Sequence, residues 1–296
     1  MLSCISDNFL CLCVSCRLIF ADMKKFHIAL AIAGSDSGGG AGIQADIKTF
    51  SSLGVYATTA ITALTAQNTR GVKTVLDVPP SFLDEQLEAI TTDFDISAIK
   101  IGMLGSGGNV RATTAFVKKM PTAVPVILDP VMKSTSGSSL LDGASGGDIM
   151  ELMRNVTLVT PNIPEAEKFT GMTIDDVSTM IAAARILLAM GCRNVLLKGG
   201  HLPADHLADV LMMGGQPPVI FESGKVATRN LHGTGCTLSS AITAFLCYGQ
   251  PLAKAVENAE CYVKKAIFAS KDVVVGEGNG PLNHFFSPKS MYKSNI

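Results

Sequence analysis

Short apolar runs alternate with longer stretches of helical spacing from residue 26 onward, and this alternation constrains the fold most strongly. The runs are rich in Val, Ile and Leu, and many end in Gly or Asp. Continuous apolar runs suit strands buried on both faces, and the stretches between them suit crossover helices. The sequence predicts an α/β fold with helices covering a mostly parallel sheet, whose strands are residues 27–33, 57–63, 98–101, 124–128, 158–160 and 195–198.

Helix ends and a sheet edge can also be placed. Apolar residues repeat at helical spacing over residues 83–90, where Ser81 and Asp84 form a capping-box-like pair. A second helix is expected from Thr173 to Met190, ended by Gly191. Gly and Pro turns separate three further short runs that predict an antiparallel edge, namely residues 209–213, 219–222 and 225–228.

Length and charge narrow the range of partners. The chain has 296 residues, of which 47% are hydrophobic, so it can bury a large single core. A formal net charge of −1 provides no overall basic field for nucleic acid or an anionic membrane. We therefore expect a small-molecule ligand and neither nucleic acid nor a membrane as partner.

The first 22 residues differ from the rest because they hold four of the eight cysteines. Cys13 and Cys16 have the spacing of a metal or redox site, but no second pair or His cluster stands at a zinc-finger interval. The apolar segment 9–20 is shorter than the roughly 20 residues of a membrane span and lacks the basic start of a signal peptide. We predict a dispensable extension over residues 1–22 and a single cytoplasmic domain over 23–296.

A first glycine-rich loop, Gly34 to Gly42, joins the first predicted strand to a helix and lets a ligand approach the backbone. Residues 40–45 fit the loose dinucleotide pattern G-x-G-x-x-A. No acid for a ribose stands between Asp46 and Asp77, which weakens an NAD-dependent oxidoreductase as an alternative. The P-loop pattern G-x-x-x-x-G-K-[ST] is absent, which argues against a Walker-type kinase.

A second glycine-rich loop, Leu231 to Thr237, precedes a helix with one apolar face. Its glycines leave backbone N–H groups open at the positive end of the helix, where they can hold a phosphoryl group in transfer. Cys236 lies in the same field, which is expected to lower its thiol pKa and make a thiolate available. A small buried Cys and a Cys hydrolase with His232 as base are the alternatives.

Polar residues follow three further predicted strands. Asp129 follows 124–128, Asn162 and Glu165 follow 158–160, and Lys198 ends the last strand. Ligands of open α/β sheets bind at these carboxyl ends. The acids with Asn162 can hold a hydrated Mg²⁺ ion when phosphates supply its other ligands, and Lys198 can meet a nucleotide phosphate. Alternatively, Asp129 is a turn residue and Glu165 an N-terminal helix charge.

The chain from about residue 26 to 286 resembles the hydroxymethylpyrimidine/phosphomethylpyrimidine kinases of thiamine biosynthesis, within the ribokinase-like superfamily. The resemblance implies a ribokinase-like three-layer fold, a homodimer, and two successive ATP-dependent phosphorylations that yield the pyrimidine diphosphate. The matching stretches are residues 33–36, 39–48, 61–71, 100–104, 128–132, 160–167, 198–201, 232–238 and 280–285.

The resemblance also implies residue roles. Cys236 stands where sugar kinases of the superfamily have Asp, and is implied as the base or positioning group for the hydroxyl. The anion hole would be Gly233, Thr234 and Gly235. The pyrimidine contacts would be Gly34, Asp46, Gln67, Met103 and Val131. Nucleotide binding would fall on Asn162, Lys198 and Thr234, and Mg²⁺ binding on Asp129 and Glu165.

Two departures from the family pattern concern phosphate binding by the second substrate. Residues 37–40 read Ser-Gly-Gly-Gly where a Pro or Ser is expected among the glycines, and Ser138 stands where an acid is commoner. A pyridoxal-type kinase and a non-catalytic pyrimidine-binding module stay open as alternatives. Gln67 and Met103 favour the pyrimidine, and the Gly-Thr-Gly-Cys loop favours catalysis.

Overall fold

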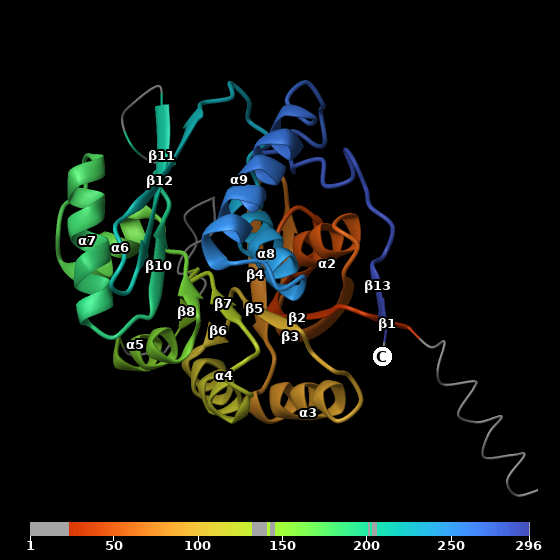
Figure 1. Ribbon diagram of the computed structural model, residues 1–296. Helices are drawn as coiled ribbons and strands as arrows, with labels where there is room; N and C mark the ends of the chain where they lie inside the picture. Colours follow the sequence, from red (N-terminus) through yellow and green to blue (C-terminus); the bar gives the residue numbers. More distant parts are fainter. Residues whose placement is uncertain (1–23, 132–140, 143–145, 201, 203–205, 296) are drawn as a thin grey trace, which may run out of the picture.

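A central sheet of nine strands organises the protein (Figure 1). The computed structural model describes residues 24–131, 141–142, 146–200, 202 and 206–295. Six strands pair in parallel, in the spatial order β10 (Asn194–Leu197), β9 (Leu158–Val159), β7 (Val126–Leu128), β5 (Ala98–Ile101), β2 (Ile28–Asp36) and β3 (Tyr56–Asn68).

Antiparallel strands extend the sheet at both edges. One edge adds β11 (His206–Met213) and β12 (Val219–Gly224), and the other adds β4 (Gly71–Asp77). Two small pairs lie outside the sheet, β1 (Lys24–Phe26) with β13 (Lys293–Asn295) and β6 (Gly105–Ser106) with β8 (Leu141–Asp142).

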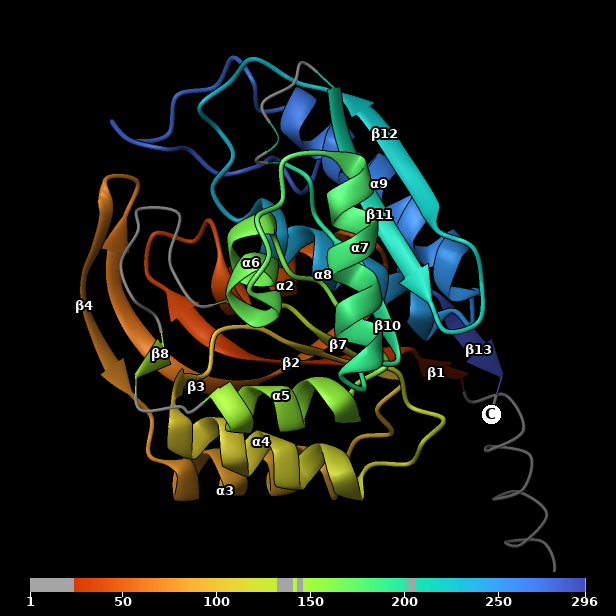
Figure 2. The same cartoon turned by 90° about the vertical axis from the view of Figure 1, so that its left-hand side faces the viewer.

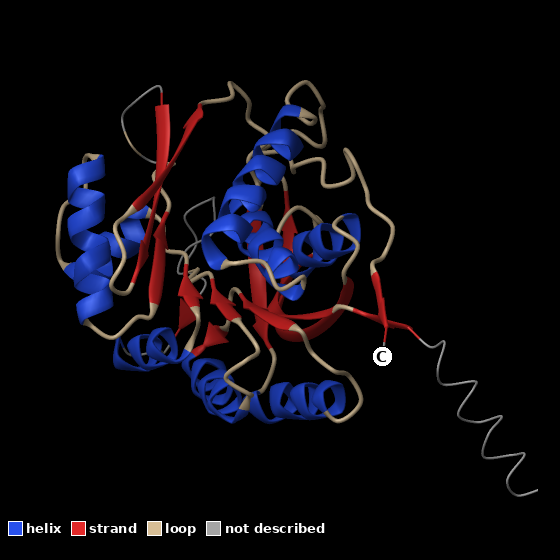
Figure 3. Cartoon of the chain, viewed as in Figure 1, coloured by secondary structure: helices blue, strands red, loops and turns tan. Residues whose placement is uncertain are grey.

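Helices cover both faces of the sheet, which makes three layers (Figure 2, Figure 3). One face carries α2 (Gly42–Ser52), α8 (Thr234–Cys247) and α9 (Leu252–Phe268). The other carries α3 (Pro80–Thr91), α4 (Gly107–Lys119), α5 (Gly146–Asn155), α6 (Ile163–Thr170) and α7 (Val177–Ala189). Among the helices of the described residues, none has the length and apolar character needed to cross a bilayer.

Strand β2 shows how the sequence builds a core on each face. Successive side chains of a strand point to opposite faces. Leu30 and Ile32 join the cluster beneath α3 to α7, whereas Ala29 and Ala31 join the cluster beneath α2 and α8. The small side chains leave room for α8, which carries the second glycine-rich loop, to pack close to the strand.

The α/β class, with helices on both faces of a mostly parallel sheet, is confirmed. Each of the six predicted parallel strands is present, and β2 and β3 run past the predicted ends to Asp36 and Asn68. Helix α7 is capped by Asp176, whose side chain accepts from the Thr179 N–H, and Gly191 follows the helix with φ of 105°.

Three local predictions were wrong or missing. The run 225–228 is a loop instead of a strand. Helix α3 has Pro79 as its N-cap and no side-chain cap, because Ser81 already lies inside the first turn. Strand β4 escaped prediction because its residues are mostly exposed and show no apolar alternation. Residues 1–22, Met132, Ser138 and His201 lie outside the described residues.

Candidate active site

A cleft of about 1590 Å³ lies at the carboxyl ends of the parallel strands. Every predicted site residue except Asp46 lines it. Sites for one small molecule usually occupy roughly 300–1,000 Å³, so this cleft has room for two ligands side by side. The structure therefore brings the motifs of distant strands into one place, as the rule for open α/β sheets predicts.

The second glycine-rich loop forms the floor of the cleft at the N-terminus of α8. Gly233 is the N-cap with φ of 85°, and a Cβ there would overlap the Gly40 carbonyl oxygen. The Thr234 N–H bonds the Leu231 carbonyl at 3.2 Å. Among the described residues, no hydrogen bond occupies the backbone N–H groups of Gly235 and Cys236, so the positive helix end is open to an anion.

A lysine–aspartate pair stands beside this helix end. Lys198 Nζ lies 2.7 Å from Asp129 Oδ1, and a Cβ on Gly235 would lie 3.4 Å from the same Nζ. Burial opposes the charge of Lys198, but the carboxylates of Asp129 and Glu165 outweigh it and raise the Lys198 pKa. The ammonium is therefore charged at neutral pH and available to a phosphate at the anion hole.

Asn162 and Glu165 form the capping box of α6. The Asn162 side chain accepts from the Glu165 N–H, and Glu165 Oε2 accepts from the Asn162 N–H, both at 2.9 Å. The interpretation of Glu165 as an N-terminal helix charge is therefore correct, although the side chain also lines the cleft. In the described part of the chain, no group of three or more His, Cys, Asp or Glu side chains is arranged to hold a metal.

Cys236 has a higher thiol pKa than its helix position predicts. Burial is the largest cause, and the carboxylates of Asp46 and Asp129 add to it. The Lys100 ammonium and the Gly42 N–H act in the opposite direction without overcoming the rise. The expectation of a lowered pKa is wrong, because the helix terminus is buried among carboxylates.

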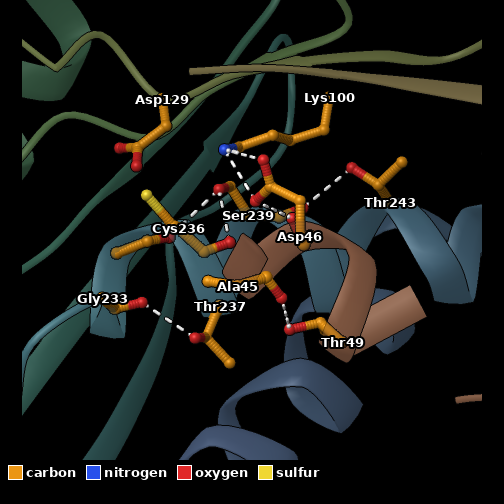
Figure 4. Close-up of polar contacts among 12 residues, drawn as sticks. Ala45, Asp46, Thr49, Lys100, Asp129, Gly233, Cys236, Thr237, Ser239 and Thr243 are labelled. Atoms are coloured by element: carbon orange, nitrogen blue, oxygen red, sulfur yellow. Dashed lines mark hydrogen bonds and ion pairs between the residues drawn. The ribbon is translucent and has the colours of Figure 1, made fainter. Parts of the chain in front are cut away.

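Asp46 lies behind the cleft in a buried ion pair (Figure 4). Lys100 Nζ lies 2.8 and 2.9 Å from its two oxygens, and Ser240 donates to Oδ1 at 2.6 Å. Both charged side chains are 0% exposed. The implied ring contact of Asp46 is absent from this arrangement, because Lys100 and Ser240 occupy its carboxylate.

Lys100 was not predicted as a functional residue. Burial disfavours its ammonium, but Asp46 together with Cys236 and Asp129 raises its pKa, so it remains charged. A Cβ on Gly102 would lie 2.7 Å from Lys100 Nζ, so this glycine makes room for the ammonium. A lysine within the apolar strand Ala98–Ile101 was a signal that could have identified it.

The opposite wall of the cleft combines apolar and polar residues. Met103 packs with Ala63 and Val131, and a Cβ on Gly34 would lie 2.9 Å from Met103 Sδ. Gln67 lines the same wall. These residues give the cleft an apolar patch together with one amide, which suits a small aromatic ring.

His232 pairs with Asp36 and Gln67. Its Nε2 lies 2.9 Å from Asp36 Oδ2 and 3.1 Å from the Gln67 amide. Within the described residues it has no hydrogen bond to Cys236, so the Cys-hydrolase arrangement is not formed. Asp36, at the end of β2, was not predicted as a site residue. Its partner His232 lies in the other glycine-rich loop, so the contact joins two segments that are far apart in the sequence.

A carboxyl pair at the far end of the cleft was also missed. Asp209 of β11 and Glu260 of α9 are buried beside each other, and Asp209 accepts from the Gly199 N–H at 2.7 Å. Burial and the neighbouring Asp209 raise the Glu260 pKa well above its ordinary value, which favours a protonated carboxyl there. Nothing local in the sequence connects these two residues.

Comparisons with known proteins agree with this geometry. The profile of a family described as phosphomethylpyrimidine kinase matches residues 36–283. Hydroxymethylpyrimidine/phosphomethylpyrimidine kinase of Rhizobium meliloti is 46% identical over 260 residues, which cover 87% of this chain and 97% of that protein. A thiamine biosynthesis bifunctional protein of Geobacter sulfurreducens is 44% identical over 263 residues, 88% of this chain, but the chain spans only 53% of its length.

Solved structures share the fold. A phosphomethylpyrimidine kinase from Clostridium difficile is 40% identical with a TM-score of 0.72, over 81% of this chain and 99% of that one. A pyridoxal kinase from Staphylococcus aureus, in complex with AMP-PCP and pyridoxal, is 29% identical with a TM-score of 0.78, over 88% and 94% of the two chains.

Proposed function

Because this chain belongs to the phosphomethylpyrimidine kinase family, we propose that it phosphorylates hydroxymethylpyrimidine and then its monophosphate, using ATP. The observation that carries the proposal is the open helix end of α8 beside Lys198, in the same cleft as the apolar residues Met103 and Val131. Phosphoryl transfer needs such positioning and charge stabilisation more than covalent chemistry.

The transferred phosphoryl group would lie at the N-terminus of α8. The N–H groups of Gly235 and Cys236 and the Lys198 ammonium stabilise the charge on its oxygens. The pyrimidine would lie on the Met103 wall, with its hydroxymethyl group toward Cys236. Cys236 orients the hydroxyl and, as a thiolate, accepts its proton; the raised pKa makes it a weak base at neutral pH.

The same cleft would also bind the nucleotide and Mg²⁺. Asp129 and Glu165 offer carboxylates at one edge of the cleft, and Mg²⁺ needs only one or two when phosphates supply other ligands, so the residues fit the ion. Mg²⁺ neutralises phosphate charge when it is bound. Thr234, Asn162 and Lys198 line the cleft, where they would contact the nucleotide phosphates.

We also propose a cytoplasmic homodimer. The hairpin of β3 and β4 exposes Leu64 (45%), Leu76 (65%) and, nearby, Phe82 (54%), a surface that a second copy would cover. Cys192 and Cys247 are buried free thiols, which fits a reducing compartment. Light scattering on Leu76→Asp should show a smaller mass than the wild type, and a monomeric wild type would contradict the dimer.

A substrate panel tests the function. Release of ADP is measured with hydroxymethylpyrimidine, its monophosphate, pyridoxal and ribose. We expect the first two to be turned over with the highest kcat/KM. Turnover of pyridoxal in preference to both pyrimidines would contradict the proposed substrate, and absence of ADP release with all four would contradict the activity.

A further inference from the structure

Ser35 lies near the end of β2, in the first glycine-rich loop, and lines the cleft. It is half-buried and faces α2, where Gln44 Nε2 donates to Ser35 Oγ at 2.8 Å. The other end of the Gln44 amide is fixed as well, because its Oε1 accepts from the Asp36 N–H at 2.8 Å. A backbone N–H only donates, so Oε1 must face Asp36 and Nε2 must face Ser35.

The hydroxyl hydrogen of Ser35 is available to a ligand. A serine hydroxyl has one hydrogen and two lone pairs, and here the Gln44 amide occupies a lone pair. Thr65 Oγ1 donates to the Ser35 carbonyl oxygen at 2.9 Å and leaves the hydroxyl untouched. Within the described residues, no group accepts the hydroxyl hydrogen. An acceptor atom of a molecule bound in the cleft can therefore take this hydrogen bond.

Ser35 lies between the apolar patch of the cleft and Cys236. The preceding residue, Gly34, faces the apolar patch, since a Cβ there would lie 2.9 Å from Met103 Sδ. Ser35 itself pairs through its backbone with Gly42, whose N–H bonds the Cys236 thiol. Helices α2 and α8 begin side by side at this point (Figure 4). A substituent that extends from a ring on the apolar patch toward Cys236 therefore passes Ser35.

The backbone N–H groups of the same loop already hold an anion, the Asp36 carboxylate. Asp36 accepts from the N–H groups of Gly38, Gly40 and Ala41 at 2.8, 3.0 and 2.9 Å, and His232 Nε2 lies 2.9 Å from its Oδ2. Burial opposes the charge of Asp36, but these contacts hold its pKa below the ordinary value, so it is ionised at neutral pH. The Ser35 hydroxyl is a donor of this loop that Asp36 does not occupy.

We propose that Ser35 distinguishes the two pyrimidine substrates by donating its hydroxyl hydrogen to a phosphate oxygen of the monophosphate. That phosphate is attached to the hydroxymethyl oxygen, so it lies on the Cys236 side of the ring. A hydrogen bond to an ionised oxygen is stronger than one to a neutral hydroxyl. Ser35 cannot pass a proton on, because Gln44 presents an N–H to it, so its role is binding. The inference rests on the proposed function, because it assigns a residue to the second of the two substrates.

Calorimetric titration in the absence of ATP tests the inference. The two ligands are hydroxymethylpyrimidine and its monophosphate. Ser35→Ala should bind the monophosphate about 10- to 100-fold more weakly than the wild type, the range for loss of a hydrogen bond to a charged group. Its affinity for hydroxymethylpyrimidine should stay close to that of the wild type. Ser35→Thr keeps the hydroxyl and should retain most of the affinity for the monophosphate.

Ser37→Ala is the matched control in the same loop. The Ser37 hydroxyl donates to the Gln67 carbonyl at 2.7 Å and accepts from the Gln67 N–H at 2.8 Å, so its hydrogen is already used. Its loss should leave the ratio of the two affinities unchanged. In steady-state kinetics, Ser35→Ala should raise KM for the monophosphate and leave kcat/KM for hydroxymethylpyrimidine near the wild-type value.

The outcomes are distinct. An unchanged affinity of Ser35→Ala for the monophosphate overturns the inference and leaves the proposed function standing. Equal weakening of both ligands also overturns it, because it indicates a contact with the ring or general damage to the site. A wild type that binds neither pyrimidine overturns both the inference and the proposed function.

Discussion

Two lysine–aspartate pairs with similar N–O distances lie near Cys236 and differ in their access to ligands. Lys100 Nζ lies 2.8 Å from Asp46 Oδ1, and Lys198 Nζ lies 2.7 Å from Asp129 Oδ1. The first pair is 0% exposed at both side chains, whereas Lys198 is 15% exposed and lines the cleft. The same type of ion pair can thus stabilise the core in one place and border the reaction site in another.

The difference in access predicts a difference in role. A fully buried pair cannot touch a ligand, so its loss should appear first as lost stability. A pair at the anion hole can exchange its partner for a phosphate, so its loss should appear first as lost turnover. Cys236 interacts electrostatically with both lysines, and its substitution reports on the chemistry between them.

The largest effect is expected for Lys100→Met, which leaves the buried Asp46 carboxyl without its ion-pair partner. The free energy of unfolding should fall by about 3–5 kcal/mol, measured by urea denaturation. Adding Asp46→Leu should restore most of the loss, because no unpaired buried carboxyl remains. Lys25→Met, at an ion pair exposed by 52% and 83%, is the control and should change little. Equal losses of stability at Lys25 and Lys100 would contradict the special role of the buried ion pair.

Cys236→Ala should lower kcat by about 10²- to 10⁴-fold, the usual range for loss of a general base, with little change in pyrimidine affinity. Cys236→Asp supplies an ionisable acceptor and should recover part of that rate. Steady-state kinetics and thermal melts distinguish this from a structural Cys. A structural role predicts normal turnover for Ala and a destabilised Asp variant.

Lys198→Met should lower kcat/KM for ATP by about 10²- to 10³-fold, as expected for loss of one stabilising group at a phosphoryl site. Its stability should fall less than that of Lys100→Met, because Asp129 keeps Thr160 Oγ1 at 3.3 Å and borders the cleft. Lys118→Met, on the surface, is the kinetic control. If Lys198→Met lost stability but kept its turnover, the roles assigned to the two ion pairs would be contradicted.

Stability at acid pH should depend on His284, a buried residue beneath α8. Burial lowers its pKa to about 4, and its Nε2 lies 3.0 Å from Thr237 Oγ1. Between pH 6.5 and 4 the unfolded chain protonates this imidazole and the folded chain does not, so stability falls as pH falls, by up to about 3 kcal/mol. Urea denaturation of His284→Gln over this range should show a smaller loss; the same slope as the wild type would exclude His284 as the cause.

The smallest effect is expected for deletion of residues 1–22, since every site residue lies at Gly34 or beyond. The kinetic constants for the pyrimidine and ATP should match those of the full chain. A folded truncated protein with much lower turnover would show that the extension serves the site.

The fold and most of the cleft could be predicted from sequence because the signals are local. Apolar runs identify strands buried on both faces, and residues that follow parallel strands must meet at one edge. Lys198 and Asp129 were found in this way, and Cys236 was found because its glycine-rich loop begins a helix. Strand β4 gave no such signal, because an exposed edge strand leaves no burial pattern.

The errors at the site concern contacts between distant segments. Asp46 was assigned to the ring from the family resemblance, but its environment depends on Lys100 in β5 and Ser240 in α8. The thiol pKa of Cys236 was misjudged for a similar reason. A helix terminus can be recognised in sequence, but the carboxylates packed around it come from other elements.

The most direct test of the account is the mass of the product. The wild-type protein is incubated with ATP, Mg²⁺ and hydroxymethylpyrimidine, and the pyrimidine is followed by liquid chromatography and mass spectrometry. The account predicts a gain of one phosphoryl group and then a second, with Cys236→Ala and Lys198→Met forming both products far more slowly. A pyrimidine that stays unmodified in the presence of folded wild-type protein would contradict it.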